Sequence, residues 1–195
     1  MSLIGSPMDQ TRQYSPTLSG IRPDHVQRYL FASNMADPGS ILDLACGCGY
    51  GAKILHDAGF DVTAGDICKD ALEFGRLHYP GPDYKLMDAA NPPSGRFDTL
   101  VTFETLEHLK NPVEFLSKVD CGMVIASVPN QERYPFDPEK FKDDDYPHLR
   151  HYTPREFESL LYESGYVVKE KWCQKDKVGI ITPGTDGMFL IYIAE

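Results

Sequence analysis

The sequence predicts an α/β protein, a three-layer sandwich in which helices cover both faces of a mostly parallel β-sheet. Short apolar runs alternate with stretches of helical periodicity, which is typical of sheets built from strand–helix–strand units. The first apolar run passes directly into closely spaced glycines and then into a helix. A length of 195 residues with 42% hydrophobic content is enough for one core and leaves little for a second. We therefore expect a single domain over residues 1–195.

The first predicted element is a helix over residues 23–35. Its apolar side chains recur at helical spacing and are expected to pack beside the segment that follows: Val26, Tyr29, Leu30 and Phe31. The preceding residues, 1–22, are polar and lack a charged segment followed by an apolar stretch. They predict a flexible tail or a lid and not a secretory signal.

Residues 40–51, SILDLACGCGYG, predict a short buried strand and a tight turn into a helix. The strand is apolar at Ile41, Leu42 and Leu44, and Asp43 can accept hydrogen bonds just before the turn. The turn contains residues that let the chain bend sharply and let a ligand approach without Cβ atoms: Gly47, Gly49 and Gly51. Turns of this kind bring backbone N–H groups up to a nucleotide-type ligand.

Five further strands are predicted from apolar runs, and the first four end in a polar side chain. The strands span residues 61–67, 84–90, 96–103, 122–130 and 187–195. The polar side chains at the ends of the first four are Asp66, Asp88, Glu104 and Asn130. An acidic residue at the end of the second strand meets ribose hydroxyls in sheets of this kind, and Asp66 has that position.

Two later helices are indicated by their capping residues. Asn111 and Pro112 fit an N-cap and a first-turn position. The second helix begins after Thr153, which forms a capping-box pattern with Glu156. Its other signals are a first-turn proline, a hydrophobic staple and a terminal glycine: Pro154, Tyr152 with Phe157, and Gly165.

Taken in order, these motifs resemble the class I S-adenosylmethionine-dependent methyltransferases over nearly the whole chain, especially small O-methyltransferase-like members of the ubiquinone-biosynthesis type. LDLACGCG at 42–49 matches the LDxGCGxG motif of that family, with Ala45 in place of its first glycine. FETLEHL at 103–109, SVPN at 127–130 and the segment 151–166 match later motifs. The resemblance implies a Rossmann-like sheet of seven strands with an antiparallel strand near the edge.

The same resemblance implies S-adenosylmethionine as the cofactor and S-adenosylhomocysteine as its product. Asp43 and the backbone of 45–49 would hold the amino acid end, Asp66 the ribose and Asp88 the adenine, while Phe103 would lie beneath the cofactor. The full implied set is Asp43, Ala45, Cys46, Gly47, Gly49, Asp66, Ile67, Asp88, Ala89 and Phe103.

Glu104, Glu107 and His108 form an ExxEH pattern whose spacing is expected to place all three on one face of a helical turn. Two carboxylates and an imidazole can coordinate a divalent ion such as Mg²⁺ or Mn²⁺. The pattern, with His148 as a distant fourth ligand, resembles metal-dependent O-methyltransferases of ubiquinone biosynthesis and of small-RNA 3′ ends. In the alternative without a metal, Glu104 touches the cofactor and His108 caps or packs.

Methyl transfer to a neutral hydroxyl group also requires a base or a metal that removes the proton. The candidate catalytic residues are Glu104, His108, His148 and His151. For His151, the alternative role is a hydrogen bond to the capped helix beside it.

Residues 131–151 are longer than an ordinary connection and predict a lid. Their aromatic side chains suit a small, moderately apolar acceptor, while their acids are expected to repel anionic substrates. The alternative is an insertion whose aromatics pack on the sheet edge: Tyr134, Phe136, Phe141 and Tyr146.

The formal net charge of −10, with scattered Lys and Arg, disfavours nucleic acid as a partner. No apolar run approaches the roughly 20 residues needed to cross a bilayer. Five cysteines without paired spacing indicate reduced thiols in a cytoplasmic protein. A methyltransferase acting on a small molecule is the leading interpretation. A nucleotide-dependent oxidoreductase and an S-adenosylmethionine-binding protein without catalysis are the alternatives.

Overall fold

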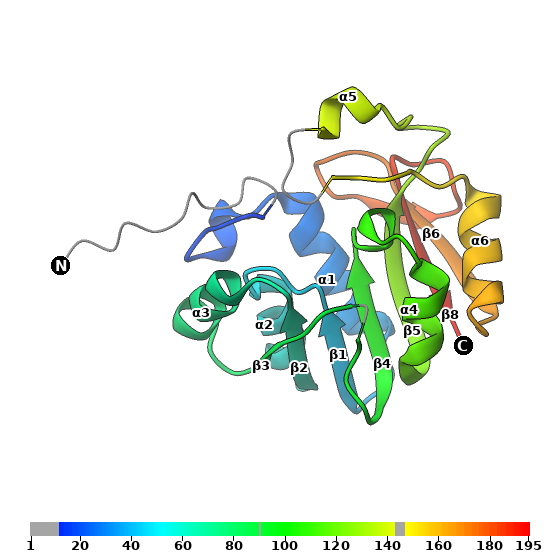
Figure 1. Ribbon diagram of the computed structural model, residues 1–195. Coiled ribbons are helices and arrows are strands. Elements are labelled where there is room, and N and C mark those ends of the chain that lie inside the picture. The colour runs from blue at the N-terminus through cyan, green and yellow to red at the C-terminus, as the bar shows by residue number, and fades with distance from the viewer. Residues whose placement is uncertain (1–11, 90, 143–146) are drawn as a thin grey trace.

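A computed structural model describes residues 12–89, 91–142 and 147–195, and Figure 1 shows a β-sheet between two layers of helices. The sheet has eight strands in the order β3-β2-β1-β4-β5-β8-β6-β7. The strands are β1 Ser40–Leu44, β2 Asp61–Asp66, β3 Asp83–Leu86, β4 Arg96–Phe103, β5 Asp120–Pro129, β6 Val168–Gln174, β7 Ile181–Pro183 and β8 Phe189–Ala194. Every strand expected from the sequence is present.

The first five strands of the sheet order, β3 to β5, pair in parallel, and the remaining pairings are antiparallel. The prediction of seven strands is wrong by one, because three-residue β7 adds to the outer side of β6. The expectation of an antiparallel strand near the edge is confirmed, since β8 lies between β5 and the edge strands β6 and β7. Its six residues are all buried, as expected for a strand with neighbours on both sides.

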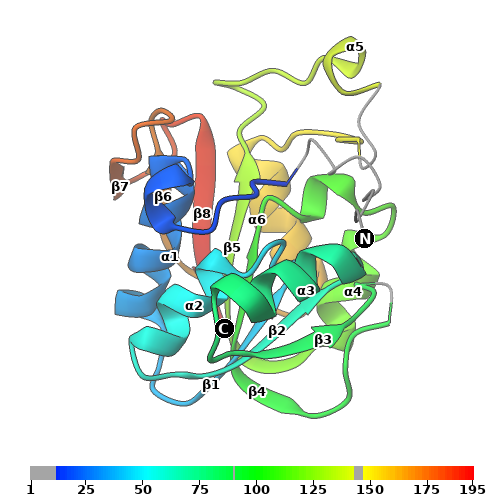
Figure 2. The ribbon, with the colours of Figure 1, turned by 90° about the vertical axis from the view of Figure 1, so that its left-hand side faces the viewer.

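The helices are α1 Pro23–Met35, α2 Tyr50–Asp57, α3 Lys69–His78, α4 Pro112–Lys118, α5 Pro138–Phe141 and α6 Pro154–Glu163, with 3₁₀ turns at Leu18–Gly20 and Leu106–His108. Figures 1 and 2 show α1, α2 and α3 on one face of the sheet and α4 and α6 on the other. Alternate residues of each strand serve the two layers. In β1, Ile41 packs under α1 to α3, while Leu42 and Leu44 pack under α4 and α6.

The expected helix boundaries are confirmed. The first helix spans the predicted residues 23–35, and α4 begins at Pro112. Thr153 and Glu156 form both hydrogen bonds of a capping box at the start of α6, and Gly165 follows that helix with a φ of +97°. Within the described ranges, no helix is long and apolar enough to cross a membrane.

The chain reverses direction across the sheet between β1 and β4, and this opens a crevice. From β1 the chain proceeds outward to β2 and β3, and then returns to add β4 on the other side of β1. The loops after β1 and β4 therefore diverge, which is where open α/β sheets bind ligands. The carboxyl ends of these strands lie toward the top of Figure 1, as does α5.

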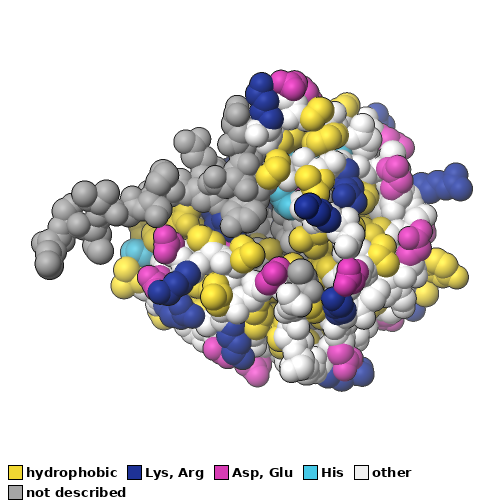
Figure 3. Space-filling view, viewed as in Figure 1, with side chains coloured by type: hydrophobic (Ala, Val, Ile, Leu, Met, Phe, Trp, Pro, Cys, Tyr) yellow, Lys and Arg dark blue, Asp and Glu magenta, His cyan; other side chains and the backbone are white. Residues whose placement is uncertain are grey.

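The two predicted lid segments fall partly outside the described residues. For 1–22 the structure describes 12–22, and for 131–151 it describes 131–142 and 147–151; Tyr146 is therefore not placed. Figure 3 shows Lys, Arg, Asp and Glu side chains interspersed over one face of the molecule. On that face, no region is dominated by Lys and Arg.

Candidate cofactor and acceptor site

A cavity of about 470 Å³ opens at the crevice formed by the carboxyl ends of β1, β2 and β4. This volume lies within the range of small-molecule sites. The cavity is also lined by the beginning of α1 and by parts of the segments 131–142 and 147–151. For description, the wall formed by the loops after β1, β2 and β3 is called the cofactor half, and the remainder is called the acceptor half.

The cofactor half is built around a turn in left-handed backbone conformation. Ala45, Gly47 and Gly49 have φ values of 68°, 56° and 81°. The N–H groups of Ala45 and Cys46 both donate to the carbonyl of Gly65, at 2.8 and 3.0 Å. A Cβ atom on Gly49 would come within 2.3 Å of the Tyr84 hydroxyl. Glycine at position 49 is therefore required by both backbone and packing.

Asp66 fixes this turn from the end of β2. Its side chain is only 3% exposed. One carboxylate oxygen accepts from the backbone N–H of Gly47 at 2.8 Å, and the other accepts from the N–H of Cys68 at 2.8 Å. The guanidinium of Arg12 donates to that second oxygen at 3.0 Å. Charge-assisted bonds of this kind are stronger than neutral ones, so Asp66 holds the glycine turn and one side of the cavity together.

Eight of the ten residues implied for cofactor binding line the cavity: Ala45, Cys46, Gly47, Asp66, Ile67, Asp88, Ala89 and Phe103. Asp43 and Gly49 do not. Asp43 is fully buried and accepts a hydrogen bond from the Tyr29 hydroxyl at 3.1 Å. Burial raises the pKa of Asp43 to about 7, against the lowering effect of the Tyr29 bond. Its role in this structure is to join β1 to α1.

An aromatic wall separates the two halves. The ring of Phe103 meets that of Tyr29 edge to face with centroids 5.0 Å apart, and Tyr29 meets Tyr50 in the same way at 5.8 Å. The Tyr50 hydroxyl lies 2.8 Å from His25 Nδ1. Burial, with Arg28 and Arg22 nearby, lowers the pKa of His25 to about 2, so this imidazole is neutral.

Glu104 begins the acceptor half directly after Phe103. It has a left-handed φ of 51° and precedes the 3₁₀ turn that carries Glu107 and His108. The prediction that all three share one face of a helical turn is therefore wrong. Ser127 donates to the Glu104 carboxylate at 2.7 Å. The same carboxylate oxygen lies 3.4 Å from Arg28 Nη1, so Glu104 is directed toward β5 and α1.

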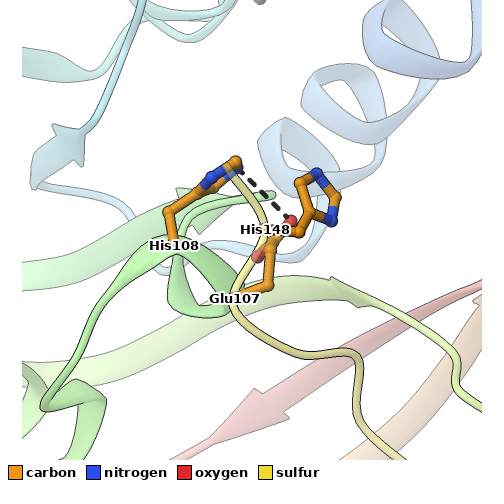
Figure 4. A group of neighbouring side chains, drawn as sticks. All are labelled: Glu107, His108 and His148. Atoms are coloured by element: carbon orange, nitrogen blue, oxygen red, sulfur yellow. Dashed lines mark ion pairs between the residues drawn. The ribbon is translucent and has the colours of Figure 1, made fainter. Parts of the chain in front are cut away.

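Glu107, His108 and His148 come together instead, as Figure 4 shows. Their potential ligand atoms lie within 4.8 Å of one another. Glu107 is fully buried, and neither carboxylate oxygen has a hydrogen-bond partner among the described residues. Burial and the nearby charge of Glu104 raise the pKa of Glu107. Three of the four residues predicted to bind a metal are thus brought together, and Glu104 is not part of the group.

Hydrogen bonds fix which nitrogens of the histidines are available. His151 Nδ1 lies 2.6 Å from the carbonyl of Tyr134 and must donate to it. His151 Nε2 then accepts from His148 Nδ1 at 2.9 Å, which leaves a lone pair on His148 Nε2. His108 Nδ1 lies 3.2 Å from the carbonyl of Pro147, which likewise leaves a lone pair on His108 Nε2. Burial and the two neighbouring histidines lower the pKa of His148 to about 3.

The described part of 131–151 contributes directly to the cavity. Tyr134, Phe141 and His148 line it, whereas His151 does not. The ring of Phe141 stacks on that of His148 with centroids 4.1 Å apart and on that of Phe136 at 5.9 Å. Aromatic rings of the described part of this segment therefore pack around the histidines.

Several lining residues were missed in the sequence. They come from the residues before and within α1, from the start of α2, and from β8 and the turn after β6: Arg12, Gln13, Arg22, His25, Arg28, Tyr50, Lys177 and Phe189. The spacing of Arg22, His25 and Arg28, three residues apart, is a helical signal that could have indicated a polar face on α1. No local pattern indicates Lys177.

Comparison with known proteins adds independent information. A family model described as methyltransferase domain matches residues 18–171. A Mycobacterium tuberculosis protein named "Probable S-adenosylmethionine-dependent methyltransferase" is 28% identical over 134 residues, which cover 65% of this chain and 48% of that protein. The ubiquinone biosynthesis O-methyltransferase of Xanthomonas campestris pv. campestris is 31% identical over 107 residues, which cover 51% of this chain and 43% of that protein.

The fold has close counterparts among solved structures. The CcbJ methyltransferase from Streptomyces caelestis superposes with a TM-score of 0.71 at 17% sequence identity, over 93% of this chain and 98% of that one. This likeness shows a common Rossmann-like architecture and nothing about substrate. The chain spans about half the length of the curated relatives it matches.

Proposed function

Since this chain belongs to the methyltransferase domain family, we propose that it transfers the methyl group of S-adenosylmethionine to an oxygen atom of a small-molecule acceptor. The observation that carries the proposal is the buried Asp66 carboxylate, which joins the glycine turn to the cavity wall. The Gly47 N–H donates to this carboxylate and is therefore not available to a pyrophosphate, whereas the sulfonium cofactor carries no phosphate. Family membership removes the support for an oxidoreductase.

In the proposed reaction, a bond forms between the acceptor oxygen and the methyl carbon as the bond from sulfur to that carbon breaks. S-adenosylhomocysteine leaves neutral at sulfur, and the acceptor proton passes to a base. Positioning supplies most of the acceleration in such an in-line displacement. Phe103 and Tyr29 of the aromatic wall are proposed to form the floor of the reaction site, and Glu104, which follows Phe103, also lines the cavity.

Glu104 is the proposed base, because Ser127 and Arg28 orient its carboxylate beside the floor. His108 and His148 are the alternative bases, since both line the cavity and the contacts at their Nδ1 atoms make Nε2 the possible proton acceptor of each. His151 is proposed as a positioning residue, because it fixes the tautomer of His148 without reaching the cavity.

A divalent metal is a further part of the proposal, with Glu107, His108 and His148 as its ligands. The buried oxygens of Glu107, which accept no hydrogen bond among the described residues, and the Nε2 atoms of the two imidazoles fit such an ion, and His108 Nε2 already lies 3.9 Å from Glu107 Oε1. When bound, the metal would lower the pKa of the acceptor hydroxyl. Manganese titration of chelator-treated protein tests this set: E107Q and H148A are expected to lose the binding isotherm, and E104Q to retain it. Loss of the binding isotherm in E104Q as well would show that Glu104 is a fourth ligand, as predicted from the sequence.

Calorimetry tests the cofactor assignment. S-adenosylhomocysteine and S-adenosylmethionine are expected to bind with Kd values of about 1 to 100 μM, and NAD not to bind. Binding of NAD alone would overturn the proposal.

The activity is tested by the release of S-adenosylhomocysteine from S-adenosylmethionine in the presence of panels of hydroxylated compounds. Cofactor binding without turnover in any panel would favour a binding protein without catalysis. Mass spectrometry of ligands released by denaturing the purified protein is an independent check on the cofactor.

A further inference from the structure

The acceptor half of the cavity carries an excess of positive charge in a chain whose net charge is −10. Apart from Arg12, which is bonded to Asp66 of the cofactor half, the cations that line it are Arg22, Arg28 and Lys177. The carboxylates next to them are Glu104 on the wall and Asp24 buried behind it. Three cations therefore face two carboxylates, and His25 between them is neutral because its pKa is lowered to about 2.

Arg28 has donors that the protein itself does not satisfy. The side chain is 1% exposed. Neither Nη1 nor Nη2 has a hydrogen-bond partner among the described residues. The nearest carboxylate oxygens, of Glu104 and Asp24, lie 3.4 and 3.6 Å away without hydrogen-bond geometry. Buried guanidinium N–H groups without acceptors are costly, and a bound oxygen atom would satisfy them.

Lys177 lines the same cavity as this arginine, and its turn is packed against α1. Gln174 Nε2 donates to the carbonyls of Asp24 and Gly179 at 3.0 and 3.2 Å, which fastens the turn after β6 to the first turn of α1. A Cβ atom on Gly179 would come within 2.8 Å of Gln27 Cγ. Lys177 itself lines the cavity, and it has no hydrogen-bond or ion-pair partner among the described residues.

We infer that the methyl acceptor carries a carboxylate, which binds between Arg28 and Lys177. This inference rests on the proposed methyltransferase function and adds the chemical class of its substrate. The expectation that acidic residues repel anionic substrates took account only of residues 131–151, whereas α1 and the turn after β6 supply cations at the cavity. The positive sulfonium of the cofactor would add to the attraction.

The location favours the carboxylate of the acceptor over that of the cofactor. The guanidinium of Arg28 lies over the ring of Phe189, at the start of β8, with its Cζ atom 4.8 Å from the ring centroid. In the sheet, β4 and β5 separate β8 from β1 and the glycine turn. Arg28 is therefore on the side of the cavity away from the glycine turn, which is implied to hold the amino acid end of the cofactor.

Calorimetry on the protein saturated with S-adenosylhomocysteine tests the inference with two probes of nearly equal shape, 3-hydroxybenzoate and 3-hydroxybenzamide. The charged probe is expected to bind at least about tenfold more tightly. In K177Q this preference is expected to fall below about threefold. The matched control K175Q changes an exposed lysine in the same turn that does not line the cavity, and it is expected to keep the preference.

R28K tests the arginine while retaining the positive charge that compensates Asp24 and Glu104. It is expected to weaken the charged probe about tenfold and to leave the affinity for S-adenosylhomocysteine unchanged. Equal affinity for the two probes, or no binding of either, would overturn the inference. A selective loss of S-adenosylhomocysteine affinity in R28K would also overturn it, by assigning Arg28 to the cofactor. Failure of the native protein to bind S-adenosylhomocysteine would instead overturn the proposed function.

Discussion

The two halves of the cavity are built by different means. The cofactor half depends on a contiguous turn of left-handed residues and on Asp66, whose carboxylate accepts from the backbone of that turn. The acceptor half depends on side chains brought from α1, from the residues after β4, from 147–151 and from the turn after β6. Backbone geometry therefore dominates one half and long-range side-chain placement dominates the other. Changes in the first half are expected to cost stability, and changes in the second to alter ligand binding.

The largest expected effect lies in the cofactor half, in Gly49→Ala. Left-handed backbone at an alanine and overlap with the Tyr84 ring together are expected to cost about 2 to 5 kcal/mol in the free energy of unfolding. Urea denaturation measures this. Gly47→Ala is the matched control, because its Cβ would meet nothing within 4 Å and only the backbone cost of about 1 to 2 kcal/mol applies. Equal losses in both variants would show that packing against Tyr84 is unimportant.

The buried carboxyl between β1 and α1 provides a test by pH. The pKa of Asp43 is about 7 in the folded protein and 3.8 as its ordinary value, so the folded state binds the extra proton between these values. Stability is therefore lost as pH rises from about 4 to 7, by on the order of 3 to 4 kcal/mol relative to Asp43→Asn.

The measurement is the difference in unfolding free energy between the native protein and Asp43→Asn across this pH range. His25 and His148 act in the opposite sense, because a lowered pKa removes stability as pH falls. They are present in both proteins, and their contribution cancels in the difference. A difference that does not vary with pH would show that Asp43 is ionised throughout.

Asp66→Asn tests whether the turn is prepared for the cofactor. Loss of charge-assisted bonds to the turn is expected to weaken S-adenosylmethionine binding about 10- to 100-fold. Calorimetry measures the affinity, and Asp61→Asn is the control because Asp61 is exposed at the other end of β2. Unchanged affinity would place the ribose elsewhere and leave Asp66 with a structural role alone.

The sequence predicted local features of the fold but not the contacts between residues that are far apart in the chain. The strand ends, the glycine turn and the capping box are local, and each was predicted from residues within about ten positions of one another. Glu104 is a residue whose position could not be predicted from local spacing. Its spacing from Glu107 and His108 predicted a shared helical face. In the structure Glu104 has a left-handed φ, accepts a hydrogen bond from Ser127 and forms an ion pair with Arg28, both of which are far away in sequence.

Prediction in the acceptor half succeeded only where a motif carried long-range information. His148 was matched to Glu107 and His108 through a family pattern, and the structure brings the three together. Lys177 and Phe189 belong to no such pattern, because they reach the cavity through pairing of β8 with β5 and through a turn packed on α1. Contacts of that kind are fixed by tertiary structure and leave no periodic signal.

In the acceptor half, Glu107→Met is expected to stabilise the fold. Glu107 is buried without a hydrogen-bond partner among the described residues, so an apolar side chain of similar length is expected to raise the free energy of unfolding by about 1 to 3 kcal/mol in chelator. Glu114→Gln is the control, because this residue is exposed and the substitution is expected to leave stability almost unchanged. Destabilisation in Glu107→Met would mean that the carboxyl group is satisfied within the fold and is not reserved for a ligand.

The smallest expected effect concerns Ala45, which stands where the family motif has glycine. Alanine differs from glycine by a single methyl group, but Ala45 has a φ of 68°, where that group causes strain. Glycine at this position would relieve about 1 to 2 kcal/mol of backbone strain. It would also lower the free energy of unfolding by about 0.4 to 1 kcal/mol, because it gives the unfolded chain greater conformational freedom. Ala45→Gly is therefore expected to be more stable by about 0.5 to 1 kcal/mol.

Cofactor affinity is expected to be unchanged in Ala45→Gly, because the backbone N–H of residue 45 keeps its bond to Gly65. Thermal unfolding measures the stability, and Ala58→Gly is the control. Ala58 is exposed with a φ of −77°, so the same substitution there is expected to reduce stability. Destabilisation at both positions would show that the methyl group of Ala45 contributes packing that outweighs its strain. The cofactor half would then depend on side-chain contacts at its centre, as the acceptor half does.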